Sequence, residues 1–140
     1  MKPRFALDSW AMLAYIQAEE PAASRVMELL LSAADSGTEL YASAINVGEV
    51  YYTLWRRNGA VAAGDALARV RELPVSIVPA SWDYVVAAAR YKATNRISYT
   101  DGFVAALAED MKATVLTGDH ELISALSGHL NVEPLRRHRL

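Results

Sequence analysis

Residues 4–9 read Arg-Phe-Ala-Leu-Asp-Ser, a short apolar run that ends at an acid followed by a hydroxyl side chain. Such a run is typical of a buried β-strand that reaches a loop. Ser9 is suited to capping a helix that continues to about residue 18. Trp10, Leu13 and Ala14 recur at helical spacing within that stretch. The sequence therefore predicts that the fold begins with a strand, an acidic loop and a helix.

The same alternation of strand and helix continues along the chain. Short β-branched or apolar runs bounded by turn residues predict further strands, and alanine-rich periodic segments predict helices. Strands that alternate with helices need crossover connections, so an α/β fold with a mostly parallel sheet covered on both faces is expected. The predicted strands cover residues 4–8, 39–42, 75–78, 114–117 and 131–135, and the predicted later helices cover about 21–36, 44–57, 60–73, 82–92, 99–111 and 120–126.

The composition fits one compact domain. The chain has 140 residues, of which 53% are hydrophobic, and its mean hydropathy is +0.09, which is ample for a packed core. We expect the domain to cover residues 1–135 and residues 136–140 to form a mobile tail. The absence of cysteine excludes disulfides, zinc–thiolate sites and cysteine nucleophiles, and it fits a cytoplasmic protein.

Neither a leader peptide nor a membrane span is expected. Asp8 interrupts the apolar stretch near the N-terminus, and no apolar run is long enough to cross a bilayer. The formal net charge is −2, so the chain as a whole does not attract a polyanion. Nucleic-acid binding would therefore need local basic residues or bound cations.

Four acids fall where an α/β fold places its ligands, beyond the carboxyl ends of the strands. Asp8 follows the first strand, Asp119 follows the fourth, and Asp101 lies in the first turn of a helix that Ser98 opens. Glu49 lies within the third helix, on or beside an apolar face and without a basic residue three or four positions away. An unpaired carboxylate in that position is costly unless another group compensates it.

Each acid also has a structural interpretation, because Asp8 could simply end a strand and Asp101 and Asp119 could satisfy free amides at helix starts. Taken together, converging carboxylates repel one another, so one must protonate or a cation must bind between them. Oxygen-only ligands favour Mg²⁺ or Mn²⁺, and such a site would activate water for hydrolysis of a phosphodiester.

Four polar residues are weaker candidates for supporting roles. Asn46 precedes Glu49 by three residues and could position a ligand, or it could be an ordinary first-turn residue. Ser9 and Thr117 flank the acids, although helix capping alone explains Ser9. Arg96 is a weak candidate for a phosphate contact. The three histidines have no paired metal-ligand spacing, so we expect them at the surface.

These acidic motifs resemble the PIN-domain family, and specifically the VapC-type toxins of bacterial toxin–antitoxin pairs. The resemblance covers nearly the whole chain, with order, spacing and length all fitting. Its four motifs are Leu7-Asp8-Ser9, residues 43–50 (Ser-Ala-Ile-Asn-Val-Gly-Glu-Val), residues 97–103 (Ile-Ser-Tyr-Thr-Asp-Gly-Phe) and residues 115–119 (Val-Leu-Thr-Gly-Asp).

The resemblance implies a three-layer α/β/α sandwich around a sheet of about five strands. It also implies an endoribonuclease that depends on Mg²⁺ or Mn²⁺ and that a cognate antitoxin neutralises, and homodimers are common in the family. By motif, the catalytic and metal-site roles fall to Asp8, Glu49, Asp101 and Asp119, with support from Thr117, Asn46 and Ser9.

Two other classes of protein could also carry an acid after the first strand. A haloacid dehalogenase-type phosphotransferase needs a second Asp two residues after the first, where this chain has Trp10. A catalytically inactive PIN-fold binding module is the alternative that stays open.

Overall fold

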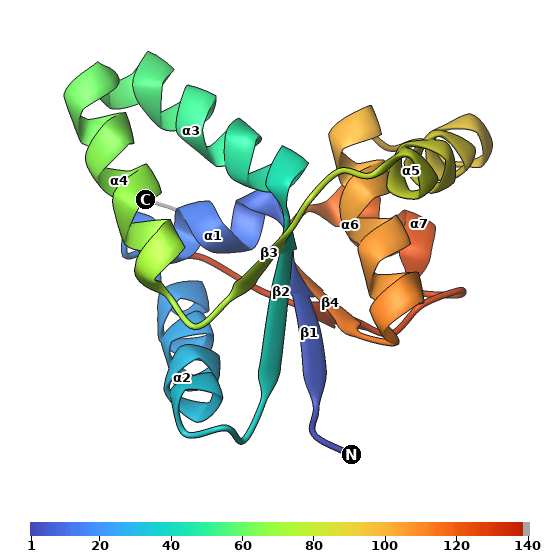
Figure 1. Cartoon of the computed structure of the whole chain (residues 1–140), viewed down its shortest axis with the longest axis horizontal. Helices are drawn as coiled ribbons and strands as arrows, with labels where there is room; N and C mark the ends of the chain where they lie inside the picture. Colours follow the sequence, from blue (N-terminus) through green and yellow to red (C-terminus); the bar gives the residue numbers. More distant parts are fainter. Residues whose placement is uncertain (139–140) are drawn as a thin grey trace.

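The computed structural model describes residues 1–138, which form five strands and seven helices in alternation (Figure 1). The five strands make one sheet in the order β3-β2-β1-β4-β5, and every neighbouring pair is parallel. The elements are β1 (Arg4–Leu7), α1 (Ser9–Ile16), α2 (Ala22–Ala34), β2 (Glu39–Ser43), α3 (Ala44–Asn58), α4 (Ala60–Glu72), β3 (Ser76–Val78), α5 (Trp82–Thr94), α6 (Tyr99–Met111), β4 (Thr114–Thr117), α7 (His120–Leu126) and β5 (Val132–Pro134).

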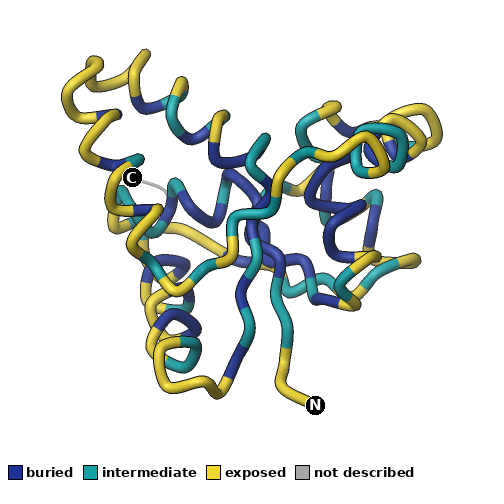
Figure 2. Tube along the Cα trace, in the orientation of Figure 1, coloured by how far each residue is buried: buried dark blue, intermediate teal, exposed yellow. Residues whose placement is uncertain are grey.

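The sheet separates two hydrophobic cores, because alternate residues of the central strands face opposite layers. In the register of β1 and β4, Leu7 lies beside Leu116 and joins the core of α1 to α4, whereas Ala6 lies beside Val115 and joins the core of α5 to α7. Figure 2 shows the buried residues gathered along the strands and the helix faces nearest to them. The predicted helix–sheet–helix arrangement is confirmed.

The strand order reverses direction between β1 and β4, and we call the edge of the sheet at the carboxyl ends of these two strands the crevice. From β1 the chain moves outward to β2 and β3, crosses through α5 and α6, and returns to β4 on the other side of β1. Loops that leave two neighbouring strands in opposite directions open a crevice between them, where α/β proteins commonly bind ligands.

The predicted elements agree closely with the observed ones, with a difference at the first helix. The first helix is capped by Asp8 and not by Ser9, since the Asp8 carboxylate accepts a hydrogen bond from the amide of Ala11, and the helix ends at Ile16. The Ser9 hydroxyl instead donates to the backbone oxygen of Asn46. Ser9 therefore joins two helices where a local cap was expected.

Residues 136–138, which belong to the predicted mobile tail, are hydrogen-bonded to the chain around the start of α2. The amide of Ala22 donates to the backbone oxygen of Arg136 (2.9 Å), and the amide of His138 donates to the backbone oxygen of Glu20 (2.8 Å). These bonds hold the segment after β5 against the start of α2. Residues 139 and 140 lie outside the described residues, and the mobility of the tail stays a prediction. No helix within residues 1–138 has the length and apolar character needed to cross a membrane.

Candidate active site

Asp8 lies at the carboxyl end of the central strand β1 and is 2% exposed. One carboxylate oxygen accepts from the amide of Ala11 (2.9 Å), and the other accepts a short hydrogen bond from the hydroxyl of Thr117. Thr117 ends β4, the strand next to β1. The carboxylate is thus fixed from two sides at the mouth of the crevice.

Thr117 links Asp8 to the acid that follows β4. Its hydroxyl oxygen accepts from the amide of Asp119 (3.0 Å) while its proton goes to Asp8. One oxygen of Asp119 in turn accepts from the first free amides of α7, those of Glu121 (2.9 Å) and Leu122 (3.2 Å). The capping role that the sequence suggested for Asp119 is therefore real, and it sets the position of this carboxylate.

Asn46 joins three helices behind the acids. It is fully buried in α3, and its side-chain amide donates to the backbone oxygen of Thr100 (3.3 Å) and to the hydroxyl of Ser9 (3.4 Å). Its carbonyl oxygen Oδ1 is buried and has no hydrogen-bond partner within the described residues. A buried acceptor without a partner is uncommon and costly, and it is the kind of group that a water or an ion satisfies.

Asp101 occupies the first turn of α6 and is half-buried. Its amide donates to the hydroxyl of the cap residue Ser98 (3.1 Å), and hydrogen bonding with Ser98 lowers the pKa of the Asp101 carboxyl against the effect of burial. The next residue, Gly102, lets the backbone of α5 approach closely, since a Cβ there would stand 2.5 Å from the backbone oxygen of Ala88. Close packing of α5 on α6 therefore fixes the helix turn that carries Asp101.

Glu49 lies one turn along α3 from Asn46 and is half-exposed, with the Tyr52 hydroxyl donating to it at 3.3 Å. Like Asp101 and Asp119, and unlike Asp8, it is only partly buried. Its expected burial on an apolar face is only partly observed.

The acids affect one another's ionisation. Burial raises the pKa of Asp8 to about 7, and the charges of Asp101 and Asp119 add to that rise, while the hydrogen bonds from Thr117 and Ala11 oppose it. Burial likewise raises the pKa of Asp101 to about 6, with further contributions from Asp119 and Glu49. Each of the four acids therefore lies within electrostatic reach of at least one other, although they belong to four separate elements.

The donor set suits a hard divalent cation, since it consists of carboxylate oxygens and the unpartnered Oδ1 of Asn46. In the described conformation of residues 1–138, no three acidic or histidine side chains stand close enough together to hold a metal ion. In this conformation one oxygen of Asp8 and one oxygen of Asp119 accept hydrogen bonds from helix amides. The residues fit the chemistry of Mg²⁺ or Mn²⁺.

A model of the PIN domain family matches residues 5–126 of the chain. The chain belongs to the PIN-domain family. The resemblance to PIN-domain proteins that the sequence predicted is therefore confirmed. A comparison with curated proteins found no match.

Solved structures share this PIN fold with the chain. The sarcin-ricin loop cleaving toxin VapC20 of Mycobacterium tuberculosis is 18% identical with a TM-score of 0.69, over 87% of this chain and 95% of that one. The DNA-bound VapBC2 of Rickettsia felis is 14% identical with a TM-score of 0.72, over 95% and 99%. The DNA-bound VapBC of Salmonella typhimurium is 14% identical with a TM-score of 0.70, over 94% and 98%. At these identities the likeness concerns the fold.

Sequence analysis did not predict the contact between two further residues beside the acids, Trp10 and Gly118. Trp10 packs directly on Gly118, where a Cβ would lie 2.3 Å from the indole ring. The only sequence signal was their position, each one or two residues from an acid of the PIN motifs.

Arg96 is exposed and makes no hydrogen bond or ion pair within residues 1–138, so a phosphate contact by it stays a prediction.

Proposed function

We propose that this PIN-domain protein is a metal-dependent endoribonuclease that hydrolyses RNA phosphodiester bonds in the cytoplasm, as the toxin of a toxin–antitoxin pair. The observation that supports the proposal is that, in a chain of the PIN-domain family, the charges of Asp101 and Asp119 reach Asp8, and those of Asp119 and Glu49 reach Asp101, although the four acids come from separate parts of the chain. A structural cap needs one acid at one helix start, and it does not require several acids to accept mutual repulsion.

In this proposal Asp8, Glu49, Asp101 and Asp119 hold Mg²⁺ or Mn²⁺, which would supply an activated water and stabilise negative charge on the phosphate. Thr117 keeps the carboxylates of Asp8 and Asp119 in register through its hydroxyl. Asn46 keeps α3 against α1 and α6, and its free Oδ1 is available to orient a water.

Cleavage of a mixed RNA pool tests the activity. The purified protein is expected to fragment RNA in millimolar Mn²⁺ and to lose that activity in EDTA, whereas a protein treated with EDTA and then with excess Mn²⁺ should recover it. RNA binding without cleavage under any metal condition would instead identify the alternative, a catalytically inactive PIN-fold module.

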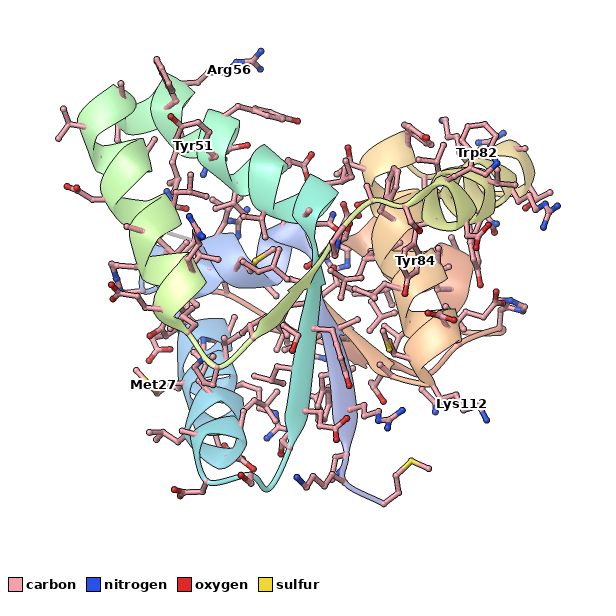
Figure 3. All side chains as sticks on the ribbon, viewed as in Figure 1. Met27, Tyr51, Arg56, Trp82, Tyr84 and Lys112 are labelled. Atoms are coloured by element: carbon pink, nitrogen blue, oxygen red, sulfur yellow. The ribbon has the colours of Figure 1, made fainter. Side chains whose placement is uncertain are left out.

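The toxin role and the antitoxin partner rest on a separate observation. Tyr52 and Trp55, which we call the aromatic face of α3, are 47% and 50% exposed, and the Arg56 guanidinium lies 5.3 Å over the Tyr52 ring. Figure 3 shows Tyr51 and Arg56 on the same helix. Exposed aromatic and arginine side chains are enriched at protein interfaces, so this face suits an antitoxin or, in a homodimer, a second copy. Two of the structural relatives are VapBC proteins bound to DNA, which agrees with a protein partner of this kind.

Expression in a bacterial host tests the toxin role. The wild-type protein should arrest growth, the Asp101→Asn variant should not, and co-expression of the small protein encoded next to it should relieve the arrest. Relief should persist when that partner is truncated to its toxin-binding segment. Equal growth with wild-type and Asp101→Asn protein would remove the toxin part of the proposal while leaving the nuclease part to the RNA assay.

A further inference from the structure

A cleft of about 440 Å³ lies directly beside the acids, between α1 and the segment that follows β5. Its lining differs in charge from the acidic crevice, because it includes two arginines and a histidine and no carboxylate. The lining residues are Trp10, Gly118, His120, Leu135, Arg136 and Arg137. The cleft therefore presents positive charge next to a concentration of negative charge.

Trp10 is the fixed wall of this cleft. Its indole ring packs on the backbone of Gly118 so tightly that a Cβ at that position would lie 2.3 Å from the ring. Gly118 stands between Thr117, which bonds to Asp8, and Asp119. The ring is thus held against the same strand end that carries the acids, and the cleft and the crevice share a boundary.

Arg137 forms the facing wall. Its guanidinium carbon lies 5.4 Å above the Trp10 ring, and its Nη1 donates to Glu19 at 3.0 Å. The backbone around it is anchored, because the amide of Leu135 donates to the oxygen of Thr117 (2.7 Å) and the amide of His138 to the oxygen of Glu20 (2.8 Å). An arginine held in place on an aromatic ring loses little further freedom when it binds an anion.

The Arg137 side chain retains donors for such an anion. A guanidinium carries five N–H donors, and within residues 1–138 its one hydrogen-bond partner is Glu19, through Nη1. Nη2 and Nε therefore remain, and arginine pairs with phosphate through two parallel hydrogen bonds. Arg136 and His120, both exposed at the same cleft, add donors around that point.

We propose that the Trp10–Arg137 cleft binds a backbone phosphate of single-stranded RNA next to the bond that is cut. The inference rests on the proposed function, since it takes RNA as the ligand. The chain carries a net charge of −2 and gathers acids at its crevice, so RNA gains affinity from local positive charge at the neighbouring nucleotide. Arg137 makes the contact, and Trp10 is a positioning residue that holds its guanidinium.

Equilibrium binding without metal tests this subsite. The Asp101→Asn protein, which should not cleave, is titrated in EDTA into a short fluorescein-labelled single-stranded RNA, and the anisotropy gives the Kd at several salt concentrations. Adding Arg137→Gln should weaken binding by about tenfold and make the salt dependence shallower by about one phosphate contact. Arg71→Gln, which removes an exposed arginine from α4, should leave both values unchanged.

Glu19→Gln is the control for the ion pair. It breaks the bond between Glu19 and Arg137 but leaves the arginine in place, so binding should be equal or tighter. If the loss in Arg137→Gln merely reflected a damaged ion pair, Glu19→Gln would weaken binding to the same degree, and the subsite would be wrong.

Two other results would also overturn the subsite: a Kd and salt slope of Arg137→Gln that equal those of Arg71→Gln, or no measurable RNA binding by the Asp101→Asn parent. Failure of the subsite is distinguishable from failure of the proposed function, because wild-type cleavage in Mn²⁺ is measured separately. Cleavage with an unchanged Kd in Arg137→Gln removes only the subsite. If Arg137→Gln weakens RNA binding but the wild-type protein does not cleave RNA, the phosphate-binding role of Arg137 is supported and the proposed nuclease activity is refuted.

Discussion

The hydroxyl of Thr117 donates a hydrogen bond to the carboxylate of Asp8, and so joins the ends of two neighbouring parallel strands, β4 and β1. The same oxygen accepts from the amide of Asp119 at 3.0 Å. One side chain therefore sets the position of two of the four acids of this PIN domain. Thr117 itself is fully buried, so no water can replace its hydroxyl without rearrangement.

Replacing Thr117 with Val should separate the role of the hydroxyl from that of the side-chain shape. Val is nearly isosteric but leaves an Asp8 oxygen and the Asp119 amide without a partner, so the free energy of unfolding should fall by about 1–3 kcal/mol. Because the Thr117 hydrogen bond lowers the pKa of Asp8 against the effect of burial, that pKa should rise further. Urea unfolding and NMR titration of the Asp8 carboxyl measure these two changes.

Thr117→Ser is the matched control, since it retains the hydroxyl and loses only a methyl group. RNA cleavage should fall about tenfold or more in the Val variant and remain near the wild-type rate in the Ser variant. Equal cleavage rates for the two variants would contradict a positioning role for this hydroxyl.

The Asp101→Asn substitution should abolish RNA cleavage without unfolding the protein. Asn retains the shape of the side chain but loses the charge that would hold a cation, and the amide of residue 101 keeps its bond to Ser98. Asp65→Asn, at an exposed position of α4, is the matched control and should cleave RNA normally. Wild-type activity in purified Asp101→Asn protein, free of contaminating nuclease, would refute the assignment of Asp101.

The sequence predicted the elements of this fold because the local signals agreed with the tertiary structure. Asp119 precedes α7 and caps it, and Ser43 and Ser81 cap α3 and α5, so residues a few positions apart determined where these helices begin. The alternation of strand and helix left few arrangements other than a parallel sheet. Asp8 and Asp119 follow two neighbouring strands of that sheet.

The interactions that the sequence could not predict are long-range ones. Asp8 and not Ser9 caps α1, and Ser9 is committed to Asn46, which lies 37 residues away. The anchoring of residues 136–138 likewise depends on partners at the start of α2. The contact of Trp10 with Gly118 belongs to the same class, because no local pattern reports which ring fills the space above a glycine.

Two glycines in helices should respond oppositely to alanine. At Gly102 a Cβ would stand 2.5 Å from the backbone oxygen of Ala88, so Gly102→Ala must push α5 away from α6 and should destabilise the protein by about 1–3 kcal/mol. At Gly64 nothing lies within 4 Å of the new Cβ, so Gly64→Ala should stabilise α4 by about 0.5–1 kcal/mol. Urea unfolding of both variants measures the difference, and equal stabilities would mean that α5 does not pack on Gly102 as described.

The stability of the metal-free protein should fall as pH rises. The pKa of Asp8 is raised from an ordinary value of 3.8 to about 7 and that of Asp101 to about 6, in both cases mainly by burial. A raised pKa in the folded state means that the native protein binds more protons than the unfolded chain. The stabilising contribution of these protons is complete below about pH 4 and is lost as pH rises through about 6 to 7.

Thermal unfolding in EDTA and in millimolar Mn²⁺ tests this account together with the proposed metal site. In EDTA at about pH 8 the Asp101→Asn variant should unfold at a higher temperature than wild type, because it lacks one of the charges that repel, and at about pH 4 the difference should shrink. Mn²⁺ should raise the wild-type midpoint, by an amount equivalent to about 2.7 kcal/mol at a hundredfold excess over its Kd, and should raise that of Asp101→Asn much less.

Asp65→Asn should follow wild type in both conditions, since that residue is exposed on α4. If Mn²⁺ leaves the wild-type midpoint unchanged and Asp101→Asn lowers it in EDTA, then these acids serve only as helix caps. The charge repulsion inferred at the crevice would then be absent, and the catalytic centre would have to lie elsewhere.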